Sequence, residues 1–134
     1  NKNAGQTVVY FRGQMFEDSG VALLLTGDFK VALAGRMAKD NARVIATAQE
    51  AAAEALANAK AAPIAALAFD CAGRKGKLAK IEDELAAIQA ALGKDVPLFG
   101  CYCAGEVGRP TVGAEAWRPQ QGTGWHVMFA ILAR

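Results

Sequence analysis

The chain has 134 residues, of which 53% are hydrophobic and 21% are charged, and its formal net charge is +2. This composition is typical of an ordered globular domain and differs from that of a disordered chain. A net charge so close to zero argues against a nucleic-acid-binding protein, which usually carries a strong excess of Lys and Arg. No stretch approaches the roughly 18 apolar residues that a membrane-spanning helix needs. We therefore expect a single domain over residues 1–134, with neither nucleic acid nor membrane as a partner.

The cysteine content gives an expectation about the compartment. The chain has three cysteines, an odd number, and their spacing indicates no obvious disulfide pair. Disulfides are rare in reducing compartments, so this pattern favours a cytoplasmic protein. No signal peptide is visible, and because the first residue is Asn1 instead of Met, we expect a processed or truncated sequence.

The first 41 residues are predicted to form β-strands joined by turns. Residues 6–16 are rich in Val, Tyr and Phe, and further apolar runs follow at 21–25 and 29–34. The segments between these runs, at 17–20 and 26–28, have the composition of turns. Residues 35–41 are predicted to form a loop. The pattern as a whole indicates additional β-hairpin strands before the main part of the domain.

An alanine-rich helix is predicted after a short strand at residues 43–46. Thr47 and Glu50 have the spacing of a capping box, which predicts a helix from Thr47 to Lys60. Pro63 ends this helix. Its small side chains would allow close packing against the sheet or, alternatively, against a partner domain.

Residues 63–103 are predicted to form a βαβ unit. The apolar runs at 63–71 and 96–103 are the predicted strands. An apolar helical stripe recurs every three or four residues between them, at Leu78, Ile81, Leu85, Ile88 and Leu92. A helical crossover of this kind is right-handed and joins parallel strands. The glycine-containing turns at 72–76 and 104–108 would then leave the sheet at one edge, which is where such sheets bind ligands.

A long connection over residues 107–124, which contains Trp117, leads to a final apolar strand at 124–133. Loops of this length inside a domain are commonly functional, and we expect this one to cover a ligand pocket. We expect the last strand to pair antiparallel with 96–103, which brings His126 close to the glycine turns. The predicted fold class is α/β (α+β), with a mixed, largely antiparallel sheet, one βαβ unit and two helices packed on it.

Three segments of the second half carry a family resemblance. They are FDCAGRKGKL, VPLFGCYCAGEVGR and the terminal WHVMFAILAR. They resemble the C-terminal FIST domain, in which an apolar strand runs into "sCaGR", a later strand into "vPvaGfysyGEig", and a last strand opens with "lHNqT". The resemblance is strongest over residues 42–134. Val127 and Phe129 replace the family's Asn and Thr after the histidine, so any polar role of those positions is absent.

The resemblance implies a non-enzymatic sensory module of signal transduction that binds a small ligand such as an amino acid. It also implies an N-terminal FIST domain or a signalling output domain as a partner, and it is compatible with a homo-oligomer. No cofactor is expected. The alternative interpretation is a protein-interaction or oligomerisation domain that docks through its alanine-rich helix or an open sheet edge.

The candidate ligand-binding residues lie at the two glycine turns and at the start of the last strand. They are Cys71, Gly73, Arg74, Gly105, Glu106 and His126. An arginine can hold a carboxylate through two parallel hydrogen bonds, and an acid can hold an ammonium group. Arg74 and Glu106 together would therefore suit an amino-acid-like ligand. Alternatively, Arg74 is a structural partner of Glu106, or part of a solvated basic turn.

The cysteines raise a third interpretation. Cys101 and Cys103 are two residues apart in a predicted strand, so their side chains should point to the same face. With Cys71 and His126 they make a candidate zinc set or a reactive thiol site. The C-x-C spacing is a weak signal for metal, however, and buried cysteines that act as small apolar residues are the simpler interpretation.

Overall fold

The computed structural model, which describes residues 8–104, 106–107 and 122–134, is built around a four-stranded sheet in the order β3-β8-β4-β5. These strands are β3 (Lys30–Met37), β8 (His126–Ala133), β4 (Pro63–Cys71) and β5 (Leu98–Cys103). β8 pairs antiparallel with β3 and with β4, whereas β4 and β5 are parallel. The predicted fold class, a mixed sheet with one βαβ unit, is confirmed.

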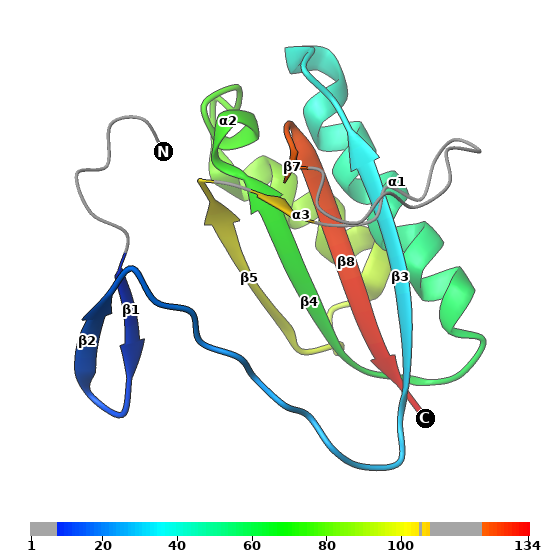
Figure 1. The fold of residues 1–134 in the computed structure, drawn as a ribbon. Helices are drawn as coiled ribbons and strands as arrows, with labels where there is room; N and C mark the ends of the chain where they lie inside the picture. Colours follow the sequence, from blue (N-terminus) through cyan, green and yellow to red (C-terminus); the bar gives the residue numbers. More distant parts are fainter. Residues whose placement is uncertain (1–7, 105, 108–121) are drawn as a thin grey trace.

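Two helices, α1 (Asn41–Ala59) and α3 (Ile81–Leu92), pack on the same face of this sheet (Figure 1). The alanines of α1 that face the sheet are almost completely buried, namely Ala48, Ala51, Ala52, Ala55 and Ala59. They pack in one cluster with the large β8 side chains Phe129 and Ile131. The small-residue face of α1 is therefore part of the core and is not free to dock a partner. Within the described ranges, no helix is long and apolar enough to cross a membrane.

The start of α1 differs from the prediction, because residues 43–46 are helical and do not form a strand. Asp40 is the N-cap, and its Oδ1 atom accepts a hydrogen bond from the backbone N–H of Ala42 at 2.7 Å. Val44, Thr47 and Ala48 then follow at helical spacing and are all buried. This periodicity outweighs the β-propensity of a single Val-Ile pair. Thr47 is therefore an interior helical residue and not the predicted cap.

The final strand also has a different partner from the one predicted. β8 lies between β3 and β4, and it is β4 that pairs with β5. Every second residue of β8 is buried under the helices, as suits a central strand: Val127, Phe129, Ile131 and Ala133. His126 nevertheless begins β8 at the end of the sheet where β4 terminates, since Val127 is opposite Asp70.

The N-terminal region consists of a hairpin and an extended connection. β1 (Val8–Phe11) and β2 (Gln14–Glu17) pair antiparallel around Arg12 and Gly13, whose φ angles of 51° and 76° are both left-handed. The strand predicted at 21–25 is absent, because those residues belong to the connection between β2 and β3. β3 in turn extends to Met37, into the predicted loop. The hairpin stands apart from the main sheet (Figure 1).

Three short elements, α2, β6 and β7, lie near the glycine turns. A single helical turn, α2 (Ala72–Lys75), follows β4 directly. β6 (Glu106–Val107) pairs antiparallel with β7 (Gly122–Thr123), which immediately precedes the start of β8.

Replacement of Gly100 by alanine is expected to destabilise the domain. A Cβ atom at this position of β5 would lie 2.8 Å from the carbonyl oxygen of Ala68 and 3.1 Å from its Cβ. Backbone atoms of the neighbouring strand cannot move away cheaply, so we expect Gly100→Ala to cost about 1–3 kcal/mol in urea unfolding. In Gly20→Ala the added methyl group meets nothing within 4 Å. A similar loss in this control would show that the packing argument is wrong.

Candidate functional site

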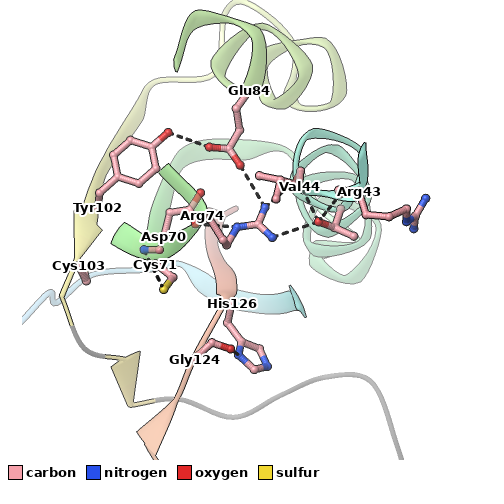
Figure 2. A network of polar contacts seen from close by, with 12 residues as sticks. Arg43, Val44, Asp70, Cys71, Arg74, Glu84, Tyr102, Cys103, Gly124 and His126 are labelled. Atoms are coloured by element: carbon pink, nitrogen blue, oxygen red, sulfur yellow. Dashed lines mark hydrogen bonds and ion pairs between the residues drawn. The ribbon is translucent and has the colours of Figure 1, made fainter. Parts of the chain in front are cut away.

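Arg74, on α2, is the centre of a buried polar network (Figure 2). Its side chain is fully buried. The Nε atom donates to Oδ1 of Asp70 at 2.8 Å, and Nη1 donates to the hydroxyl of Thr47 at 3.1 Å. The Nη2 atom donates to Oε1 of Glu84 at 3.0 Å and to the carbonyl of Val44 at 2.8 Å. One guanidinium group thus joins β4, α1 and α3.

Tyr102 extends the network to β5, because its hydroxyl donates to Oε2 of Glu84 at 2.7 Å. Glu84 is 1% exposed, and a buried carboxylate is tolerated only when it is paired and hydrogen-bonded. The sequence analysis did not identify Glu84 as an inward-facing residue. A signal was present, since position 84 is three residues after Ile81 and four before Ile88 on the apolar stripe of α3.

The protonation of Asp70 is shifted by its surroundings. Burial raises the pKa of Asp70 to about 7, the positive charge of Arg74 opposes this rise, and the nearby Glu84 carboxylate adds to it. Burial and the hydrogen bond to Glu84 also raise the pKa of Tyr102 above its ordinary value. Around neutral pH, Asp70 therefore exchanges a proton beside an ion pair formed by Arg74 and Glu84.

A pocket of about 190 Å³ lies between α3 and β5, with this network at one end. It is lined by Ile81, Glu84, Leu85 and Ile88 of α3, by Leu98, Gly100, Cys101 and Tyr102 of β5, and by Ala68 and Asp70 of β4. Its walls are mainly aliphatic, and carboxyl and hydroxyl groups gather at one end. This combination of an apolar hollow and a few convergent polar groups is typical of small-molecule sites.

The glycine-turn edge brings together some of the predicted site residues. The Sγ atom of Cys71 accepts a hydrogen bond from the backbone N–H of Gly73 at 3.3 Å. His126 is nearby at the start of β8 (Figure 2), with its Nδ1 atom 2.8 Å from the carbonyl oxygen of Gly124. Cys71, Gly73 and His126 therefore lie at the expected edge.

Trp125 is also part of this edge and was missed in the sequence analysis, which considered only Trp117. A Cβ atom on Gly73 would lie 3.3 Å from the Trp125 ring, so the ring rests on the glycine. The Nζ atom of Lys77 is 5.6 Å from the centre of the same ring. The position of Trp125 directly before His126 was the signal in the sequence that could have identified it as part of this edge. Trp117 lies outside the described residues.

The position of Arg74 differs from the sequence-based expectation of a ligand contact or a solvated basic turn. Its guanidinium group is turned into the core, and its hydrogen bonds are made with Asp70, Glu84 and α1. The burial of Arg74 therefore argues against direct contact between its guanidinium group and a ligand at the glycine-turn edge. Gly105 lies outside the described residues, and only the backbone of Glu106 is described, so pairing of Arg74 with Glu106 stays a prediction.

Cys101 is exposed, and Cys71 and Cys103 are half-buried, which corrects the expectation of buried apolar cysteines. Cys101 and Cys103 share a face as predicted, with their sulfur atoms 3.5 Å apart. Cys71 is opposite Cys103 in the strand register. Within the described part of the chain, no three or more His, Cys, Asp or Glu side chains are grouped so that they could hold a metal ion. The described residues therefore do not support the candidate zinc set of Cys71, Cys101, Cys103 and His126.

Comparison with protein families shows that the model of the FIST C domain matches residues 13–109, which is more than half of the chain. The matched region contains α1, the βαβ unit and every residue of the Arg74 network. It begins well before residue 42, where the motif resemblance starts. No curated protein and no solved structure matches this chain. FIST C domains are sensory domains of signal transduction, and this chain belongs to the FIST C domain family.

Proposed function

We propose that this sensory domain binds a small, amino-acid-like ligand in the pocket between α3 and β5. The observation that carries the proposal is a hollow of about 190 Å³ whose aliphatic walls end at Asp70, Glu84 and Tyr102. Pockets for drug-sized ligands measure roughly 300–1,000 Å³. A ligand of amino-acid size is therefore a better match than a nucleotide or a larger cofactor.

The polar end of the pocket suits the ammonium group of such a ligand. The two carboxylate oxygens of Glu84 accept hydrogen bonds from Arg74 and Tyr102, and each carboxylate oxygen has two lone pairs. An ammonium group offers three donors and a positive charge, which would also favour the ionised form of Asp70. The apolar part of the ligand would then pack against the aliphatic residues of α3.

Lys75 supplies a positive charge near the same end of the pocket. Its Nζ atom is 5.5 Å from the centre of the Tyr102 ring, and Lys75 is exposed. We assign to it the carboxylate-binding role that the sequence analysis gave to Arg74. Arg74 is then a positioning residue, because it orients Asp70 and Glu84 without contacting the ligand. Signalling would pass to an N-terminal FIST domain or an output domain, and no catalytic step is part of the proposal.

The proposal is tested by thermal unfolding in the presence of individual amino acids and small amines. A ligand at one hundred times its Kd stabilises the folded state by about 2.7 kcal/mol and raises the Tm. We expect Leu85→Trp to abolish this rise, because the indole would fill the pocket from a position that is 43% exposed. Gln89→Trp is the matched control, since this exposed α3 residue does not line the pocket.

Two outcomes would contradict the proposed site. If no amino acid or amine raises the Tm of the wild-type chain, the pocket does not bind this class of ligand. If the rise persists in Leu85→Trp but is lost in His126→Ala or Cys71→Ser, the ligand binds at the glycine-turn edge instead. That edge, with Gly73, Gly105 and Glu106, was the location predicted from the sequence.

A further inference from the structure

The face of the sheet opposite the helices is apolar, and in the described part of the chain no helix lies on it (Figure 1). We call it the open face. Strand alternation and register assign to it Val31, Leu33, Gly35 and Met37 of β3, His126, Met128, Ala130 and Leu132 of β8, Leu67, Phe69 and Cys71 of β4, and Phe99, Cys101 and Cys103 of β5. None of these is Asp, Glu, Lys or Arg. Phe99 is 67% exposed and Val31 54%.

The open face has the form of a continuous, flat surface. Leu33, Ala130, Leu67 and Phe99 follow one another in register across all four strands. At Gly35 the side chain of Met128 occupies the space that a Cβ atom would need, so β3 has no ridge there. Contiguous apolar surfaces of this kind mark interaction sites. Because the open face carries no Asp, Glu, Lys or Arg, we expect an apolar partner and not a nucleic acid.

The same chain carries a second uncovered apolar segment, the N-terminal arm formed by residues 8–29. Its exposed large apolar residues are Val8, Tyr10, Phe11, Met15, Phe16, Val21, Leu23, Leu24 and Leu25. Strand pairing places Val9, Phe11, Gln14 and Phe16 on one face of the hairpin, and Val8, Tyr10, Met15 and Glu17 on the other. A hairpin with three large apolar side chains on each face is suited to a position between two layers, because a single surface would leave one of these faces exposed.

We propose that the open face is covered by the N-terminal arm of a second copy, in a two-fold symmetric dimer with exchanged arms. The two open faces would turn toward each other with the two hairpins between them. Two hairpins contain four strands, and at about 4.8 Å per strand they match the width of one four-stranded sheet. A connection of residues 18–29 can span up to about 40 Å, which is enough to carry each hairpin across. A two-fold axis then buries both uncovered surfaces on both copies.

The test measures the mass of the whole chain in solution by light scattering after size exclusion. The chain has a mass of 14.0 kDa, so the wild type is expected at about 28 kDa, the mass of a two-fold assembly. Phe99→Asp on the open face and Tyr10→Asp on the arm should each raise the Kd of the dimer at least about 100-fold, since each buries a charge. Both positions are exposed within one chain, so folding should be retained. Ala53→Asp, on the exposed side of α1, is the control and should remain dimeric.

Mixing the two variants separates exchange between copies from folding of the arm onto its own chain. A Phe99→Asp chain has an intact arm, and a Tyr10→Asp chain has an intact open face. An equimolar mixture should therefore form heterodimers at concentrations where each variant alone is monomeric. A monomeric wild type, a dimer that survives both substitutions, or a mixture that stays monomeric would each overturn the proposal.

Discussion

Arg74→Ala is expected to destabilise the domain by about 3–5 kcal/mol in urea unfolding followed by circular dichroism. The substitution leaves the carboxylate of Glu84 and the side chain of Asp70 buried without their cationic partner, and removal of one member of a buried ion pair costs this much. It also removes donors from Thr47 and from the carbonyl of Val44. Because domains are stable by about 5–15 kcal/mol in total, the variant should be close to unfolding at 37 °C.

The matched control is Arg43→Ala. Arg43 also forms an ion pair, with Glu50 at 3.0 Å, but its side chain is 55% exposed. Exposed ion pairs contribute between 0 and about 1 kcal/mol, so this substitution should change the free energy of unfolding little. Equal losses in Arg74→Ala and Arg43→Ala would show that the buried network does not stabilise the fold in the way that its contacts indicate.

Protonation of Asp70 is expected to contribute to the free energy of unfolding of the wild-type domain, and this contribution should decrease as the pH rises from about 4 to about 7. Burial raises the pKa of Asp70 from 3.8 to about 7 in the folded state. Between these values the folded state keeps a proton that the unfolded state has lost, so rising pH favours unfolding. The contribution is fully present below pH 4, falls by up to about 1.4 kcal/mol per pH unit, and is lost above pH 7.

Asp70→Asn isolates this contribution, because an amide has the shape of the protonated acid and cannot ionise. Its oxygen can still accept from Arg74, and its nitrogen can donate to Glu84. We expect Asp70→Asn to lack the decrease between pH 4 and pH 7 and to be more stable than the wild type at pH 8. Asp95→Asn, at an exposed position, should follow the wild-type profile. Parallel profiles for the wild type and Asp70→Asn would contradict a protonated Asp70.

The central part of the fold could be predicted from local patterns. The apolar run at 63–71, the helical stripe through Ile81, Leu85 and Ile88, and the second strand all follow from the periodicity of buried residues, which needs no knowledge of distant partners. Local patterns predicted the N-terminal half of the chain less well. There, short apolar runs such as 21–25 and 43–46 are too brief for periodicity to separate strand, helix and extended connection.

In the candidate site, the role of Arg74 could not be predicted from the local sequence. The CAGR motif identified Arg74 as important, but its role depends on groups 4, 10, 27 and 30 residues away in the chain. A basic residue in a glycine turn has the same local sequence whether it faces solvent or the core. Only the packing of α1 and α3 around the Arg74 side chain decides that Arg74 is buried and that the pocket lies on the helix side of the sheet.

The sequence by itself therefore determined the family, the βαβ unit, the fold class and the shared face of Cys101 and Cys103, because each rests on a motif or on the spacing of residues along one segment. The tertiary structure decided which strand lies beside which, with β8 inserted between β3 and β4. It also decided the buried role of Arg74, and it left the second face of the sheet without a helix among the residues that the structure describes. Residue spacing shows which side of an element is apolar. Which surface covers that side depends on how all the apolar sides of the chain pack against one another.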